Sequence, residues 1–308
     1  MEAITLLFNL EYYQRIAEEY QIPLRLVGEL GRSYASRVAS FLLERGLPPH
    51  PSFLEMGSSD GFFAHLFLKE LEKKRKVREY VCLDFSLDSL RKSLKYRSSF
   101  LNVCAEASTL SGTHLCFRDK QFDVILMNEL LDDLPAWEVE EKNGRKWVTV
   151  LKNDEQRGFE FVELPIEDIG IREKEELERY EKEIFPETKV FYLGISRVLK
   201  EVNRVLKDEG FLFIMDYFKE DPCIWALDKH HPIANITTPL HRDSLYKILK
   251  RSGFSILYWK SVWKFFEESD EGKEERYVWG EGNVPLWKIL RDHITFPVEY
   301  EVILAKKE

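Results

Sequence analysis

The segment SFLEMGSSDGFFAHLFLKEL (52–71) constrains the fold of this chain most strongly, because an apolar strand pattern leads through a glycine turn directly into a helical pattern. The same order recurs at 80–94, where YVCLDF is followed by SLDSLRKSL. Further apolar strand patterns lie at 100–105, 122–130, 211–217 and 298–305. Strands that alternate with amphipathic helices are typical of a parallel sheet covered by helices on both faces, so we predict an α/β fold.

The composition excludes several classes of protein. With 308 residues, 44% of them hydrophobic, the chain has enough apolar material for a core, which excludes a disordered or collagen-like chain. No apolar run approaches the ~18 residues that span a membrane, and the N-terminal residues do not resemble a secretory signal. Four scattered cysteines, with Cys82 inside a strand pattern, favour reduced thiols. We therefore expect a cytoplasmic protein without a membrane partner, and the net charge of −9 disfavours a nucleic-acid partner.

Four segments organise the chain. We expect an N-terminal helical segment at 1–50, the first half of the α/β core at 51–135, an insertion at 136–190 and the second half of the core at 191–308. In the first segment, the apolar stripe of SYASRVASFLLERG predicts a helix over 33–46. Ser33 is the expected cap of this helix and Gly46 its expected end.

The insertion differs in character from the core. Residues 138–165 contain two strand-like stretches, with turn residues at Asn143-Gly144 and Asn153-Asp154, and predict a small β unit. Residues 170–185 are dense in charge with a narrow apolar stripe, which predicts a surface helix or lid.

The second half of the core returns to the alternating pattern. Apolar residues from Ile195 to Leu206 predict a helix that ends at Gly210. The segments 255–266 and 298–305 predict a strand pair at the edge of the sheet.

The glycine turn after the first strand is the strongest candidate for a binding site. Glu55 ends the strand pattern, Gly57 permits a tight turn near a ligand, and Gly61 permits close packing where the next helix begins. Ser58 and Ser59 lie between the glycines, so the segment is neither a Gly-x-Gly-x-x-Gly dinucleotide motif nor a phosphate loop. An acid at this strand end suits a ligand with an amino group, and we expect Ser58 and Ser59 to belong to the same binding site.

Acidic residues also follow the next two strands. Asp84 stands 23 residues after Gly61, where a carboxylate can accept hydrogen bonds from two ribose hydroxyls. Phe85 can cover an adenine ring, and Ser86 follows in the same predicted site. Glu106 can accept the adenine amino group or be a solvated turn residue. The alternative for Glu55 and Asp84 is that both are ordinary strand-end acids.

A second polar group follows the fourth strand, in MNELLDDLP (127–135). Asn128 and Glu129 emerge from the buried strand itself, which favours a role in the site. Asp132 and Asp133 are equally well explained as helix caps. Three candidate catalytic acids therefore follow the carboxyl end of one predicted strand: Glu129, Asp132 and Asp133. Elsewhere, His230, His231 and His241 have no cysteine or acid at ligand spacing, so no metal site is expected.

This ordered set resembles the class I S-adenosylmethionine-dependent methyltransferases. The resemblance implies a Rossmann-like, mostly parallel seven-stranded sheet with helices on both faces, an antiparallel edge strand and, here, a β insertion after the fourth strand. It also implies S-adenosyl-L-methionine as cofactor, with Glu55 near its methionine amino group and Asp84 on its ribose.

The wording is similar to that of the MidA-type family, which includes mitochondrial complex I assembly methyltransferases. NELLDDLP resembles the family pattern NE-[FL]-[FL]-D-[AV]-LP, and GRSYASRVASFL and NITTPLHRDSLYKILKRSGF also resemble family segments. The chain resembles a divergent member of that family, because Ser58-Ser59 replaces Pro-Gly in the turn, His241-Arg242 replaces Val-Asp, and Asp216-Tyr217-Phe218 replaces Asp-Tyr-Gly.

The resemblance implies methylation of an arginine side chain on a partner protein. Glu129 can hold a guanidinium through two parallel bonds, and Asp132 or Asp133 can take the proton later. The acidic site can equally accept a cationic small molecule. A tRNA methyltransferase, or an assembly factor that keeps the fold with little or no catalysis, remains the alternative.

Overall fold

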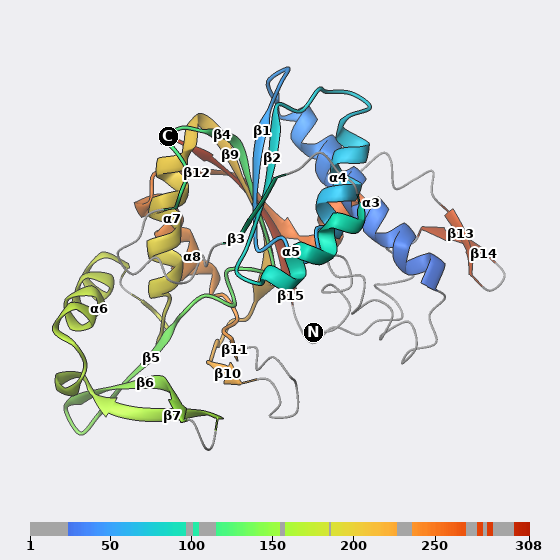
Figure 1. Cartoon of the computed structure of the whole chain (residues 1–308). Coiled ribbons are helices and arrows are strands. Elements are labelled where there is room, and N and C mark those ends of the chain that lie inside the picture. Colours follow the sequence, from blue (N-terminus) through green and yellow to red (C-terminus); the bar gives the residue numbers. More distant parts are fainter. Residues whose placement is uncertain are drawn as a thin grey trace.

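The computed structural model describes residues 24–96, 101–104, 115–154, 158–184, 186–226, 236–268, 276–279, 282–285 and 299–308. At its centre is a seven-stranded sheet in the order β12-β15-β9-β4-β1-β2-β3 (Figure 1). The strands are β1 (Ser52–Met56), β2 (Glu79–Asp84), β3 (Leu101–Cys104), β4 (Phe122–Asn128), β9 (Leu206–Phe218), β12 (Phe254–Ser261) and β15 (Glu299–Lys307). The fold class predicted from the sequence is confirmed.

One strand of this sheet runs against the others. β15 is antiparallel to both of its neighbours, β9 and β12, whereas the remaining pairs are parallel. The antiparallel strand was predicted at the edge of the sheet, but it is second from the edge, and β12 outside it runs in the direction of the parallel strands. Because β4 and β2 lie on opposite sides of β1, the strand order changes direction at β1, which is where ligands bind in open α/β sheets.

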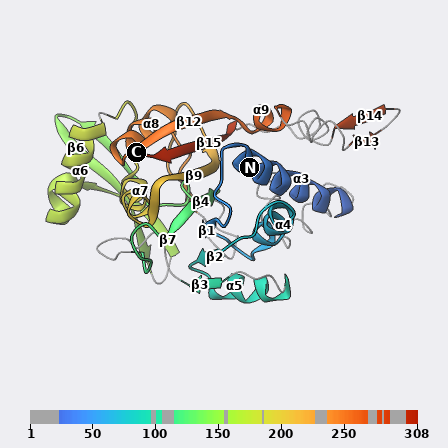
Figure 2. The same ribbon diagram turned by 90° about the horizontal axis from the view of Figure 1, so that it is seen from above.

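Helices cover both faces of the sheet (Figure 2). The first face carries α3 (Leu24–Glu44), α4 (Phe62–Leu71), α5 (Leu87–Ser93) and α9 (Val262–Glu267), and the second carries α6 (Ile171–Ile184), α7 (Leu193–Val205) and α8 (Arg242–Arg251). Each face has its own hydrophobic core, because alternate residues of the strands point to opposite sides. In β1, for example, Phe53 belongs to the first core and Leu54 to the second.

Several element boundaries differ from the sequence prediction. α3 begins at Leu24, so Ser33 lies inside the helix, because LRLVGEL before it is also compatible with a helix. α7 ends at Val205 and β9 begins at once, so Gly210 lies inside a strand. The segment 255–266 is not one strand, since Ser261 caps α9 by accepting a hydrogen bond from the Lys264 amide.

A second sheet lies between β4 and α7 in the chain and stands apart from the central sheet (Figure 1). It comprises β5 (Trp137–Lys142), β6 (Arg145–Asp154), β7 (Gly158–Pro165) and β8 (Val190–Phe191), in the order β7-β6-β5-β8. Asn143 and Gly144 form the predicted turn, with φ of 54° and 74°. Asn153 and Asp154, also expected in a turn, instead pair with β7 as the last residues of β6.

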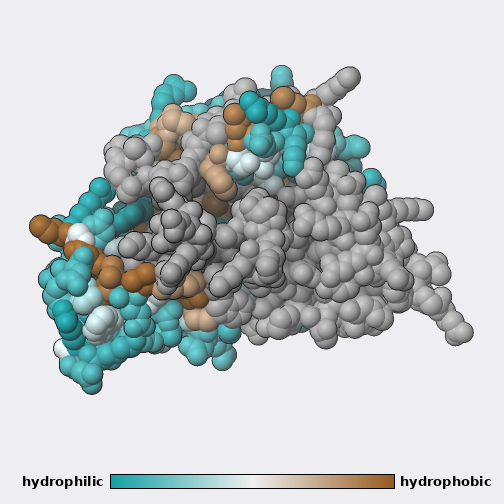
Figure 3. Space-filling view, turned by 60° about the horizontal axis from the view of Figure 1, so that its bottom comes forward, coloured by the Kyte–Doolittle hydropathy of each residue, from teal (hydrophilic) through white to brown (hydrophobic). Residues whose placement is uncertain are grey.

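The surface of this second sheet is largely charged. On the side of the molecule that carries it, Figure 3 shows mostly hydrophilic residues crossed by a band of hydrophobic ones. Lys142 pairs with Glu163 at 2.7 Å, and Lys146 pairs with Glu181 of α6 at 2.5 Å.

The remaining elements are short. They are η1 (Leu94–Tyr96), η2 (Ile166–Asp168), β10 (Trp225–Ala226), β11 (Ile236–Thr237), β13 (Arg276–Trp279) and β14 (Gly282–Pro285). Of the helices that the structure describes, none combines the length and the apolar character that crossing a bilayer requires.

Candidate cofactor and acceptor site

The turn after β1 is tied to the end of β2. The amides of Gly57 and Ser58 both donate to the Leu83 carbonyl, at 2.8 and 3.2 Å, and the Gly61 amide donates to the Ser58 carbonyl at 3.0 Å. Gly57 and Gly61 have φ of 73° and 72°, which glycine adopts without strain. A Cβ atom on Gly57 would lie 3.1 Å from the Leu130 side chain, so the turn also packs closely on the loop after β4.

Ser59 has a left-handed backbone conformation, with φ of 48°. This is the position where the resembled family pattern has glycine. A non-glycine residue in this region costs about 1 kcal/mol or more, yet the turn keeps a conformation suited to glycine. Ser59 therefore adopts a backbone conformation that glycine would adopt without strain.

Asp84 joins the turn to the end of β2. Its Oδ2 accepts from the Ser59 amide at 2.7 Å and its Oδ1 from the Ser86 amide at 2.8 Å. Burial raises the pKa of Asp84, and these backbone donors oppose the rise. The neighbouring Phe85 is 70% exposed, which leaves an aromatic surface beside the carboxylate. Ser86 also caps α5, because its hydroxyl accepts from the Ser89 amide.

Glu55 is buried beneath the turn, on the face covered by α3 and α4. Its Oε2 accepts from the Tyr80 hydroxyl at 2.9 Å and from the Cys82 thiol at 3.9 Å. Burial raises the pKa of Glu55 to about 8, and the negative charge of Asp84 adds to the rise. A buried carboxyl of this kind ionises when a cation approaches it. Glu106 lies outside the described residues.

At the end of β4, a tyrosine from the N-terminal helix meets Asn128. The Tyr34 hydroxyl of α3 donates to Asn128 Oδ1 at 2.8 Å. Asn128 is 6% exposed, and its Nδ2 has no hydrogen-bond partner among the described residues. Glu129 follows with φ of 47°, held by its amide, which donates to the Met215 carbonyl at 2.8 Å. Burial raises the pKa of Tyr34 and the Glu129 carboxylate raises it further, so the two side chains lie near each other.

The loop after Glu129 wraps around a buried aspartate of β9. Asp216 Oδ2 accepts from the amides of Leu131 and Leu130 at 2.8 and 3.2 Å, and its Oδ1 accepts from the Tyr217 amide at 2.8 Å. The Asp132 carboxyl is hydrogen-bonded to Asp216, and burial raises the pKa of Asp132 well above its usual value, with the Asp216 charge adding to this. Burial thus favours the protonated form of Asp132. Asp133 is exposed.

The structure thus brings the predicted acids together with residues that the sequence prediction left out of the site. These residues are Asp216, Tyr34, Tyr217 and Tyr300. Burial raises the pKa of each tyrosine, and the charge of Glu129 adds to the rise for Tyr34 and Tyr300, that of Asp132 for Tyr217 and Tyr300. Asp216 was recognisable as an acid near a strand end. Tyr34 carried no such signal, because it lies within an apolar helix stripe 94 residues from Asn128.

The histidines have another explanation. His241 is the N-cap of α8, with a ring nitrogen that accepts from the Ser244 amide, while His230 and His231 lie outside the described residues. In the part of the chain that the structure describes, no group of three potential metal-binding side chains occurs.

These side chains fit a cationic ligand. The turn supplies backbone for close approach, Asp84 supplies acceptors suited to hydroxyls, and Glu55 supplies a buried carboxyl that gains its charge next to a cation. An exposed aromatic ring stands beside Asp84. A nucleoside with an amino group and a sulfonium has matching chemistry.

Comparison with known proteins also indicates a ligand of this kind. Residues 34–236, well over half of the chain, match the model of a family described as "Putative S-adenosyl-L-methionine-dependent methyltransferase". The matched range includes the turn, the acids after β4 and the whole of β9. No curated protein matches the sequence.

Two solved structures from Burkholderia thailandensis share the fold. An uncharacterized superfamily protein aligns over 91% of this chain and 80% of its own, with 15% identity and a TM-score of 0.61. A second, named as a "likely methyl transferase" and bound to S-adenosyl-homocysteine, aligns over 91% of this chain and 78% of its own, with 14% identity and a TM-score of 0.60. At these identities the likeness concerns the fold.

Proposed function

Since the chain belongs to this family of S-adenosyl-L-methionine-dependent methyltransferases, and is therefore a methyltransferase with that cofactor, we propose that its acceptor is an arginine side chain of a partner protein. The observation that carries the proposal is the cluster of acids at the ends of β4 and β9, where Glu129 and Asp132 lie close to Asp216. Such a cluster favours a cationic acceptor over a neutral or anionic one.

On the cofactor side, the proposed roles follow the chemistry of each residue. Asp84 accepts hydrogen bonds from the ribose, and its bonds to the Ser59 and Ser86 amides keep its carboxylate in position. Glu55 becomes ionised beside the amino group, while Gly57, Ser58, Ser59 and Gly61 form the turn that lets the ligand approach the backbone. The cofactor supplies an electrophilic methyl group on a positively charged sulfur.

On the acceptor side, Glu129 binds the guanidinium and orients one of its nitrogens. The amide group of Asn128 contributes its buried Nδ2 as a donor toward the site. Alignment supplies most of the rate of an in-line displacement, so rigid support matters more than a strong base. Burial favours the protonated form of Asp132, so Glu129 takes the proton from the acceptor and the exposed Asp133 passes it to solvent.

A transfer assay tests the acceptor class. The full chain is incubated with cell lysate and methyl-labelled cofactor, and the labelled species are separated and identified by mass spectrometry. We expect label on arginine side chains of protein, lost with Glu129→Gln but retained with Asp133→Asn at a reduced rate. Label on a small molecule or on tRNA would contradict the proposal.

If the protein is an assembly factor without catalysis, the transfer assay combined with a cofactor-binding measurement gives a different result. Saturable binding of S-adenosyl-homocysteine without transfer of label to any species would favour a protein that keeps the fold and has lost catalysis. The substitutions of Ser58 and Ser59 for the Pro-Gly of the family pattern make this the second candidate.

A further inference from the structure

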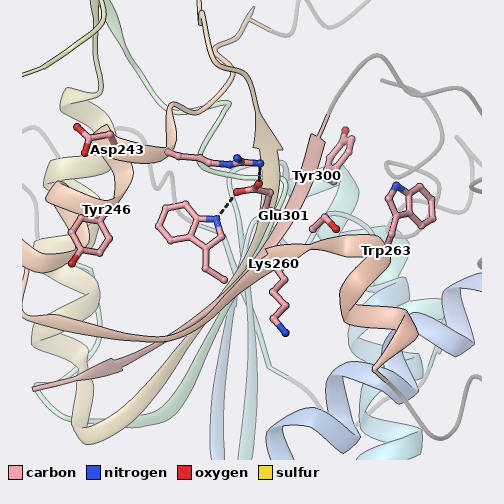
Figure 4. Close-up of a pocket in the computed structure, with 9 residues that line it drawn as sticks. Asp243, Tyr246, Lys260, Trp263, Tyr300 and Glu301 are labelled. Carbon is pink, nitrogen blue, oxygen red and sulfur yellow. Dashed lines mark hydrogen bonds and ion pairs between the residues drawn. The ribbon is translucent and has the colours of Figure 1, made fainter.

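A cavity of about 720 Å³ opens at the border of the central sheet formed by β12, β15 and the start of α8 (Figure 4). Aromatic rings contribute much of its wall, including Trp259, Trp263 and Tyr300. Its charged wall residues include Arg242, Asp243 and Glu301. An aromatic wall with carboxylates is suited to an organic cation.

The cavity adjoins the acidic cluster through the pairing of β15 with β9. In this antiparallel register Glu301 lies opposite Asp216, and Tyr300 lies opposite Tyr217. The rings of Tyr300 and Tyr217 are 5.8 Å apart. Two residues of the cavity wall, Tyr300 and Glu301, therefore lie on the strand next to the one that carries Asp216.

Glu301 is a buried carboxylate whose countercharge is a surface arginine. The Glu301 side chain is 3% exposed, and it accepts from the Trp259 indole N–H and pairs with the Arg242 guanidinium, as the dashed lines in Figure 4 mark. Arg242 is 55% exposed. Lys260 points away from Glu301 and pairs with Glu268.

Glu301 and Arg242 do not depend equally on their ion pair. A carboxylate without a cation is costly when it is buried, so Glu301 requires one. The Arg242 side chain, by contrast, is 55% exposed, so its guanidinium stays hydrated when another cation takes its place at Glu301. A guanidinium or ammonium from another molecule can therefore replace Arg242 in a nearly balanced exchange.

We propose that this cavity docks a basic side chain of the acceptor protein, which takes the place of Arg242 at Glu301 beside the methylation site. The inference rests on the proposed function and adds a specificity subsite to it. It selects acceptor segments with a second cationic residue near the methylated one. Arg242 thereby acts as an internal competitor that sets a threshold for docking.

Peptide binding to the full chain tests this subsite directly. The probes are a dye-labelled peptide with three arginines separated by glycines and its counterpart with glutamines, measured by fluorescence anisotropy without cofactor at physiological salt. We expect the arginine peptide to bind about tenfold more tightly to Arg242→Ala, because the competitor is gone, and about tenfold more weakly to Glu301→Gln. Arg251→Ala, at the other end of α8 and paired with Glu183 on the surface, should leave the affinity unchanged.

Chemical rescue keeps the test valid if a variant is unstable. Arginine amide should raise the melting temperature of Arg242→Ala, whose Glu301 lacks its cation, and should leave that of Glu301→Gln unchanged. Equal affinities in the native chain and Arg242→Ala, together with no rescue, would overturn the proposal. Equal binding of the glutamine peptide would overturn it as well.

The two proposals fail separately. Peptide binding that changes as expected, with no methyl group on any arginine, would leave the subsite standing and remove the proposed function. Arginine methylation with the same KM in the native chain, Arg242→Ala and Glu301→Gln would leave the function standing and remove the subsite.

Discussion

At the scale of single residues, the carboxyl groups of Glu55 and Asp84 lie at the ends of neighbouring strands and differ in how readily they ionise. Glu55 is enclosed by aromatic and thiol groups, so burial dominates and its pKa rises to about 8. Asp84 receives two backbone N–H bonds, which favour its charged form and offset part of the effect of burial. Glu55 therefore ionises when a cation binds beside it, whereas the Asp84 carboxylate can accept hydrogen bonds from hydroxyl groups.

Cofactor binding should therefore depend on pH through Glu55. Below a pKa of about 8 the carboxyl must release its proton before it can hold an ammonium group, so affinity for S-adenosyl-homocysteine should rise with pH from 6 to 8. Glu55→Gln should bind about tenfold more weakly at pH 8 and lose most of this pH dependence. Titration calorimetry measures both, with Glu79→Gln at the opposite end of β2 as control. Identical pH profiles for the native chain and Glu55→Gln would remove Glu55 from the site.

The backbone of Ser59 allows a test of the turn. Ser59→Gly should increase the free energy of unfolding by about 0.5–1 kcal/mol, because glycine adopts φ of 48° without steric cost. Thermal or urea unfolding measures the change, and Ser58→Gly, in the same turn but without a positive φ, should not stabilise the chain. A destabilised Ser59→Gly variant would show that the Ser59 side chain supports the turn.

At the scale of elements, the loop after β4 is held by an acid that comes from β9. Asp216 binds the amides of Leu130 and Leu131, so the segment that carries Glu129 depends on a side chain 85 residues further along the chain. The left-handed backbone of Glu129 depends on the same support, together with the bond from its amide to the Met215 carbonyl.

Asp216→Asn should affect this loop more than the cofactor turn. Replacing one carboxylate oxygen by an amide nitrogen leaves at least one buried donor without its acceptor, which costs about 1–3 kcal/mol of stability. We expect kcat to fall with little change in the affinity for S-adenosyl-homocysteine. Asp133→Asn, in the same loop but exposed, should retain native stability. A fall in cofactor affinity as large as the fall in kcat would contradict the loop assignment.

The strand–turn–helix order of the core could be predicted because each such element carries its own local pattern. Residues 52–71 and 80–94 identified β1, α4, β2 and α5 from apolar periodicity and turn residues alone. The bonds of Tyr34 to Asn128 and of Asp216 to the loop could not be predicted. They join residues that are distant in sequence, and a tyrosine in an apolar stripe resembles any core residue. The predicted start of α3 was wrong for a local reason, since a serine within a helical pattern does not have to be the N-cap of the helix.

At the scale of the whole molecule, three buried carboxyls oppose the usual dependence of stability on pH. Burial raises the pKa of Glu55, Asp132 and Asp216 above their unfolded values, so in the folded state all three favour the protonated form. Their contribution to stability is complete below pH 4 and is lost as pH rises through the folded pKa values.

The free energy of unfolding should therefore decrease between about pH 5 and pH 8. Each such carboxyl contributes a slope of at most about 1.4 kcal/mol per pH unit within its range. Urea unfolding at several pH values measures the slope, and Glu55→Gln should make it shallower because one titrating group is removed. A stability that increases steadily from pH 5 to pH 8 in the native chain would contradict the pKa directions.

The ion pair between Arg242 and Glu301 constrains how these two positions can change in evolution. A descendant that lost the carboxylate at 301 would keep a guanidinium with nothing to neutralise, and one that lost the guanidinium at 242 would inherit a buried anion. Each change alone is penalised, so the two positions should drift through evolution as a linked pair. An alignment of orthologues in which 242 and 301 vary independently would show that the pair carries no such constraint.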